Sequence, residues 1–317
     1  MIVSLIIYHA FAPFYGSWPS PMGVVGGDVG IVYKWIAIYA YFGMLETFVL
    51  MSGFLSAKVL FSKDFNRSIF LRKKLTRLYV PCLFWGFLWM EIDVIPPPIR
   101  VSTLLSLLQG AGHLWYLPML LWCMVFACFL LSRVSVLASI IITSILAFIQ
   151  IDIGFRIPEA LYYLLFYNWG LILYRYIHVL YKYIEWICPI CIVAFPLLVY
   201  MYVNNIDYMH THFYIGRLFK LLLSFTGCMM YMGVGFYGMH RLTTARSIRF
   251  VTSIANASFT IYLLQEILLR LLYYKTSYCA RLGVFYPIVA IVLILFFSYI
   301  GDKLLNVNRF TRCLVGK

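Results

Sequence analysis

Charged residues are scarce in this sequence, and acidic residues are the scarcest of them, with 11 Asp and Glu against 25 Lys and Arg. Only 11% of the 317 residues are charged, whereas soluble domains carry about 25%. So few charges cannot cover a water-facing surface, which excludes an ordinary soluble domain. The apolar content of 64% equally excludes a disordered chain. Apolar runs recur along the whole length, so this composition fits a bilayer as the solvent.

These runs predict an all-α fold, a polytopic membrane helical bundle with about ten transmembrane helices in a single domain, residues 1–317. Backbone polar groups in lipid must bond within their own segment, so each run of about twenty apolar residues is interpreted as a helix. The expected spans are 1–15, 31–60, 78–95, 114–132, 134–151, 159–180, 183–203, 213–238, 254–274 and 282–305. The first is too short for a hydrocarbon core of roughly 30 Å, so we expect the first helix to extend upstream of Met1.

The formal net charge of +14 indicates orientation rather than nucleic-acid binding, because the basic residues lie between the apolar spans. When successive loops alternate in side, 17 of the 25 Lys and Arg fall on one side. The positive-inside rule makes that side cytoplasmic. Residues 61–77 are then a cytoplasmic, interfacial segment, and residues 204–212 face outside.

A histidine and a glutamate lie inside the first two spans, where an ionisable side chain costs a few kcal/mol on insertion scales. His9 precedes Pro13 by four residues, near the outer end of its span. Its neutral imidazole suits a general base for a hydroxyl, or it is a packing histidine bonded to a neighbour. Glu46 shares a helix face with Gly53. It either orients a histidine or a substrate hydroxyl, or joins two helices that pack closely at Gly53.

An aromatic segment opens the fourth span from the outer side. It contains His113, Trp115 and Tyr116. Aromatic rings at this depth are typical of an interfacial belt. The alternative is a platform for an acceptor sugar, since flat rings and a histidine donor suit a polyhydroxylated ligand.

A basic cluster ends the cytoplasmic segment just before the third span. It consists of Lys73, Lys74 and Arg77. Such residues ordinarily bind lipid headgroups and set orientation. The same charges also suit the phosphates of a cytosolic coenzyme.

Together these features resemble the acyltransferase 3 family, integral membrane enzymes that O-acylate cell-surface polysaccharides and related glycans in bacteria. The elements that carry the resemblance are His9, Glu46 before Phe48, Ser52, Gly53 and Phe54, the basic run to Arg77 and Pro81, Trp115 to Leu117, and Ser258 to Leu264. The order and spacing of these motifs, on a ten-span frame, extend over nearly the whole chain.

The resemblance implies a multi-pass enzyme of the bacterial inner (cytoplasmic) membrane, surrounded by membrane lipids, with no bound metal and no nucleic-acid partner. An acyl-CoA, usually acetyl-CoA, is the co-substrate, and a polysaccharide or lipid-linked glycan is the acceptor. His9 and Glu46 are the expected catalytic residues. The expected donor-binding residues are Lys73, Lys74 and Arg77, and the expected acceptor-binding residues are His113, Trp115 and Tyr116.

The chain departs from the family pattern at three places. The family commonly has an arginine some ten residues before the first-helix histidine, but only eight residues precede His9. Val49 replaces a phenylalanine of the signature, and Gln265 stands where a histidine often follows. A glycan exporter is the alternative function, because polar residues in spans also mark translocation paths. The ionisable residues gather at a few positions instead of forming a continuous track, which favours the enzyme.

Overall fold

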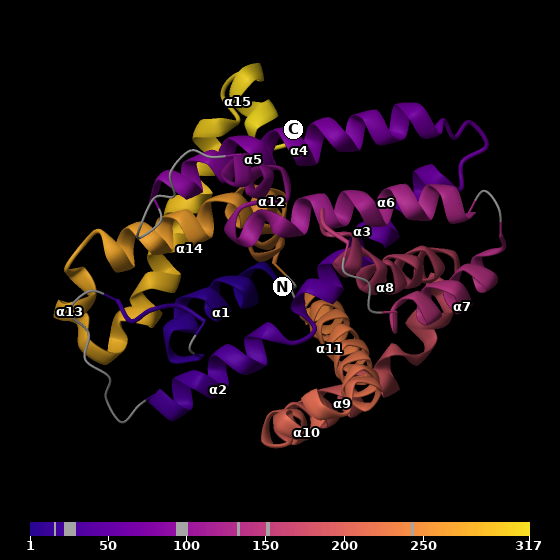
Figure 1. The fold of residues 1–317 in the computed structure, drawn as a ribbon, viewed down its shortest axis with the longest axis horizontal. Helices are drawn as coiled ribbons and strands as arrows, with labels where there is room; N and C mark the ends of the chain where they lie inside the picture. Colours follow the sequence, from indigo (N-terminus) through magenta and orange to yellow (C-terminus); the bar gives the residue numbers. More distant parts are fainter. Residues whose placement is uncertain (16, 22–29, 93–100, 132–133, 150–152, 242–243) are drawn as a thin grey trace. The chain divides into compact units, whose positions relative to one another are not determined.

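The computed structural model describes residues 1–317 except 16, 22–29, 93–100, 132–133, 150–152 and 242–243. Every element in the described ranges is an α-helix or a short 3-10 helix (Figure 1), which confirms the all-α class. Within these ranges five segments are long and apolar enough to cross a membrane: Gly30–Leu60, Gly112–Leu130, Lys182–Asn204, Phe213–Met239 and Tyr278–Leu305. Ile2–Phe14 and Leu137–Leu146 are shorter apolar helices. The fold therefore fits a polytopic membrane protein, with fewer long apolar spans in the described part than the ten expected.

The second predicted span consists of two helices rather than one. Helix α2 (Gly30–Tyr41) ends before Phe42, and α3 (Met44–Leu60) begins after Gly43. Gly43 has φ of 75°, a left-handed conformation that side chains with a Cβ atom rarely adopt. Hydropathy alone cannot show this break, because the residues around it are all apolar.

The predicted interfacial segment and the third span, by contrast, share one continuous helix. Helix α4 (Arg67–Ile92) starts within the basic run and continues through Pro81 into the apolar residues. The helix therefore has no break at residue 78, where the expected interfacial segment meets the expected span. Helix α7 (Val136–Leu146) is also shorter than the expected span 134–151.

The chain forms two compact units whose segments alternate along the sequence. The first unit comprises Met1, Phe42–Lys73 and Met119–Thr243. In it α3 packs against α8 (Ile157–Arg175), α11 (Phe213–Arg241) packs against α3 and α9 (Ile177–Asn204), and α7 packs against α8. The backbone of Tyr167 lies where a Cβ on Gly53 would be, which confirms the close packing considered for this glycine. This unit also contains α10 (Ile206–Thr211) and most of α6 (Tyr116–Leu131).

Helix α9 carries a stripe of large apolar side chains that the rest of its unit leaves uncovered. Trp186, Ile190, Val193 and Leu197 are all more than half exposed. Their spacing of three and four residues places them on one face of the helix. A continuous apolar face of this kind is costly in water and suits contact with lipid.

The second unit comprises Ile2–Tyr41, Lys74–Pro118 and Thr244–Lys317. Its centre is α1 (Ile2–Tyr15), which packs against α2, α12 (Ala245–Tyr274) and α14 (Tyr286–Leu305). Helices α12 and α14 also pack against each other. The shorter elements are α5 (Val101–Leu108), η1 (Gly112–Trp115), α13 (Tyr278–Leu282), η2 (Gly283–Phe285) and α15 (Arg309–Leu314).

Candidate active site

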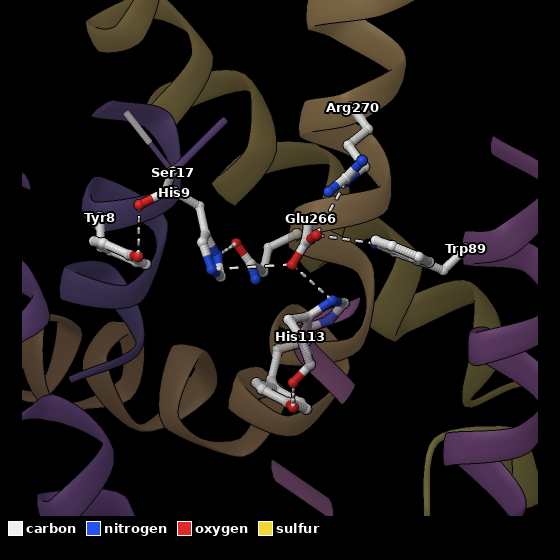
Figure 2. A network of polar contacts seen from close by, with 9 residues as sticks. Tyr8, His9, Ser17, Trp89, His113, Glu266 and Arg270 are labelled. Atoms are coloured by element: carbon white, nitrogen blue, oxygen red, sulfur yellow. Dashed lines mark hydrogen bonds and ion pairs between the residues drawn. The ribbon is translucent and has the colours of Figure 1, made fainter. Parts of the chain in front are cut away.

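Glu266 is the centre of a buried polar network in the second unit. Its side chain is almost fully buried, and it lies on the same face of α12 as Tyr262, Arg270 and Tyr273 because these positions are three or four residues apart. Figure 2 shows its carboxylate between His9, His113, Trp89 and Arg270. A buried carboxylate is stable only with hydrogen bonds and opposite charge around it, so the neighbours of Glu266 define the site.

One carboxylate oxygen is held by two donors. Trp89 Nε1 and Arg270 Nε each donate to Oε1 of Glu266 at 3.0 Å. The Arg270 guanidinium lies 4.5 Å from the ring centroid of Trp89 and 4.9 Å from that of Trp18, within range of cation–π attraction to both. Arg270 is thus held by two rings and a carboxylate, and it fixes Oε1 in place.

The other oxygen, Oε2, faces two histidines. His113 Nδ1 lies 3.0 Å from it. The opposite nitrogen, Nε2, donates to the Tyr262 carbonyl at 2.9 Å, and the Tyr262 hydroxyl donates to the His113 carbonyl at 2.6 Å. Since Nε2 already bears a hydrogen, a favourable contact of Nδ1 with an ionised Glu266 requires the protonated ring. His113 and Glu266 then form a buried ion pair.

His9 is the other histidine near Oε2, and its hydrogen bonds differ from those of His113. Its Nδ1 is 2.8 Å from Oε1 of Gln265, an oxygen that can only accept, so Nδ1 carries the hydrogen of the neutral ring. Its Nε2 is 3.9 Å from Glu266 Oε2, too far for a hydrogen bond. The lone pair of Nε2 is therefore available to a substrate proton, with a carboxylate near enough to stabilise the resulting positive charge.

Ring and backbone contacts position His9. The indole of Trp18 stacks on the imidazole, with centroids 5.5 Å apart and planes inclined by 13°. The Tyr273 hydroxyl donates to the carbonyl of Ala10, the next residue of α1, at 2.8 Å. Helix α12 thus holds α1 beside the histidine and supplies Gln265 and Glu266 from the same surface.

The side-chain amide of Gln265 has an unused donor. Gln265 is fully buried, and its Nε2 makes no hydrogen bond to any described residue. A buried donor left unpaired costs about 1–3 kcal/mol. Such a group is available to a substrate oxygen.

Glu46 lies in the first unit, where it accepts a hydrogen bond from Ser224 Oγ at 2.9 Å. Ser224 also contacts the hydroxyl of Tyr162 at 3.3 Å, so α3, α8 and α11 are joined through one buried polar group. This is the structural hydrogen bond that the sequence analysis set against a catalytic role. The role of Glu46 in orienting a histidine or an acceptor stays a prediction.

The expected donor-binding residues share helix α4. Lys73 is exposed and Lys74 is half-buried. Burial lowers the pKa of Lys74 below its usual value, and the charge of Arg77 lowers it further. Arg77 Nε donates to the carbonyl of Gly316 at 2.7 Å, so part of its guanidinium binds the C-terminal segment. Phosphate binding by these three residues stays a prediction.

The expected acceptor platform is divided by the structure. His113 faces Glu266 and Tyr262 with both ring nitrogens. Tyr116 is buried with its ring 5.8 Å from that of Tyr262, and Trp115 is partly exposed. Acceptor binding by these residues stays a prediction, and the structure adds an ion pair for His113 that the sequence analysis did not include.

Sequence reasoning missed most of the network around Glu266. It considered Gln265 only as a departure from a family pattern, and it gave no role to Arg270, Trp18 or Trp89. Glu266 and Arg270 are four residues apart in the expected span 254–274, a spacing that places opposite charges on one helix face. That pair was the available signal, because charges inside a span need partners.

The fold and this site define a class: a helical membrane protein with a buried histidine whose free nitrogen faces a carboxylate. The chain belongs to the acyltransferase 3 family, since the model of its acyltransferase domain matches residues 1–302. It is therefore an acyltransferase, an enzyme that moves an acyl group from a donor to an acceptor. No curated protein and no solved structure matches the chain.

Proposed function

We propose that the protein transfers an acyl group, in particular acetyl from acetyl-CoA, to a hydroxyl of a cell-surface or exported polysaccharide at the bacterial inner membrane. The observation that carries the proposal is His9, whose Nδ1 hydrogen is bonded to Gln265 while Nε2 faces Glu266 without a hydrogen bond. This is the arrangement of a general base for a hydroxyl. Family membership supports the reaction class.

In the proposed reaction the acceptor hydroxyl gives its proton to His9 Nε2 as its oxygen attacks the thioester carbonyl. The carbon–sulfur bond then breaks, and the coenzyme thiolate leaves and takes the proton back from His9. The imidazolium exists only between these steps, when Glu266 at 3.9 Å stabilises it. Glu266 thus acts most strongly where charge develops.

The unpaired amide of Gln265 supports a further role in this step. Attack on the thioester places negative charge on the carbonyl oxygen, and a pre-positioned N–H donor stabilises it. Gln265 Nε2 is buried and has no described acceptor. We propose that this Nε2 donates a hydrogen bond to the oxyanion. Oε1 of the same side chain accepts from His9 Nδ1 and so keeps the hydrogen of the neutral ring on that nitrogen.

The charge distribution supports a cytoplasmic entry for the donor. In the orientation that the basic residues predict, α4 enters the membrane from the cytoplasm at Lys73, Lys74 and Arg77. These cations suit the phosphates of a cytosolic coenzyme. His9 belongs to the outer half of α1 in the same orientation, so the pantetheine arm must extend into the membrane to reach it.

Purified protein in sealed liposomes, incubated with labelled acetyl-CoA and extracted cell-surface glycan, tests the proposal. We expect the label to appear on glycan as an alkali-labile ester, and the Gln265→Leu variant to transfer it about a hundredfold more slowly. Glycan movement across the bilayer without labelling, in the presence of acetyl-CoA, would favour the exporter instead.

A further inference from the structure

The first unit contains a second group of ionisable side chains outside the network around Glu266. Its members are Arg217, Lys220 and Ser224 on α11, Tyr162 on α8 and Glu46 on α3, and we call it the α11 cluster. The three α11 residues are three and four positions apart, so they share one helix face. The proposed reaction gives no task to its two cations.

The two cations lie near the end of α11 that begins at Phe213. Arg217 and Lys220 are four and seven residues along the helix, roughly 6 Å and 10 Å from its start. The predicted orientation places this end on the outer side of the membrane. An acceptor exposed on that side therefore meets Arg217 and Lys220 before Ser224 and Glu46.

Arg217 is fixed in place with part of its guanidinium unused. Its Nε donates to the Ala147 carbonyl at 2.8 Å, and its Cζ lies 4.3 Å from the ring centroid of Tyr162. These contacts hold the plane of the group. Neither Nη makes a hydrogen bond to a described residue, so two parallel donors remain, the geometry that binds a carboxylate or a phosphate.

Lys220 adds a second cation beside the same ring. Its Nζ lies 5.5 Å from the Tyr162 centroid, and Glu46 attracts it electrostatically. It makes no hydrogen bond within the part of the chain that the structure describes. Glu46 is the one carboxylate of the α11 cluster, so the cluster has one positive charge in excess among the described residues, and an anion would neutralise it.

We propose that Arg217 and Lys220 form an oxyanion site, for a carboxylate or phosphate, and that an acidic sugar of the acceptor glycan supplies this group. The glycan as source rests on the proposed function, whereas the oxyanion site does not. The phosphate of a bilayer lipid has the same chemistry and is the other source. Arg217 and Lys220 are then specificity residues that select acidic glycans.

Binding measured without acyl donor tests this site separately from catalysis. The purified protein in a phosphate-free detergent is titrated with a glucuronate-containing oligosaccharide, with its carboxyl-reduced counterpart and with short-chain phosphatidylglycerol. The variant Arg217→Gln/Lys220→Gln removes both charges, and Arg217→Lys/Lys220→Arg keeps them in case the first is unstable. Lys275→Gln, at an exposed cation of the second unit, is the control.

We expect the acidic oligosaccharide to bind, the reduced one to bind at least tenfold more weakly, and the charge-removing variant to lose tenfold or more in affinity. The charge-keeping variant and the control should stay within about threefold. If only phosphatidylglycerol binds and the double variant weakens it, the oxyanion site stands and its source is lipid, which overturns the glycan. Equal binding of every probe to every variant would overturn the site itself.

Discussion

Replacing Glu266 with glutamine tests how the site stabilises charge. The substitution keeps the shape of the side chain and its capacity to accept from Trp89 and Arg270, both at 3.0 Å. It removes the negative charge beside His9. The resting enzyme has a neutral His9, so the effect through His9 falls on the step in which its ring becomes positive. The loss of the ion pair with His113 acts on the resting enzyme and lowers its stability.

The distance sets the size of the effect. Two unit charges 3.9 Å apart interact by about 4 kcal/mol at an effective dielectric constant of about 20. The positive charges of Arg270 and His113 offset part of this attraction. We therefore expect a loss of about 2–4 kcal/mol of transition-state stabilisation, which is a fall in kcat of about thirtyfold to a thousandfold.

The assay is the initial rate of acetyl transfer from labelled acetyl-CoA, with thermal unfolding measured on the same sample. The control is Asp302→Asn, at another buried carboxylate of the second unit, which accepts from Thr260 at 2.6 Å and pairs with Lys317 at 2.7 Å. We expect Asp302→Asn to lower the unfolding temperature with kcat within about threefold of the parent enzyme. A Glu266→Gln enzyme with equally little loss of kcat would refute the electrostatic role.

Three further predictions concern the remaining residues. Glu46→Gln should lower kcat at least tenfold if Glu46 orients the reacting groups, and a change in thermal stability alone would leave it a structural link to Ser224. Neutralising the donor cluster should raise the KM for acetyl-CoA at least tenfold without changing the affinity for acceptor, whereas Lys63→Gln should change neither; the cluster consists of Lys73, Lys74 and Arg77. Cysteines introduced at Asn66 and Asn205 should react with an impermeant reagent from opposite sides of the membrane, and labelling from one side would contradict the predicted orientation.

The sequence predicted the helical class correctly because hydropathy is a property of each segment alone. It failed where a boundary depends on backbone conformation, as at Gly43, or on helix continuation through Pro81, as in α4. At Gly43 the helix breaks without a change in composition. In α4 the composition changes from basic to apolar without a break in the helix.

The site was predictable only in part, for a related reason. His9 and Glu46 were identifiable because ionisable residues in apolar spans are costly wherever they point. The partner of His9 depends on which helices pack together, and α12 supplies Gln265 and Glu266 from 256 residues along the chain or more. Charge position along a sequence cannot show that proximity.

The ion pair of His113 shows the same limit, because its hydrogen-bond partner Tyr262 lies 149 residues along the chain. The sequence placed this histidine among aromatic rings at the membrane interface, which suited a sugar platform. Its backbone and ring pair reciprocally with Tyr262, and this pairing turns Nδ1 toward Glu266. The motif Ser258 to Leu264, considered above only as a family signature, thus positions a histidine of another segment.

The rate of the His9→Ala variant tests the central claim most directly, because a methyl group cannot accept a proton. General base catalysis supplies about a hundredfold to ten-thousandfold, so we expect acetyl transfer from acetyl-CoA to fall by that factor at unchanged membrane insertion. The matched control, His178→Ala, removes an exposed histidine and should leave the rate as it was. A well-inserted His9→Ala enzyme that keeps half the activity of the parent would contradict the assignment of His9 as the base.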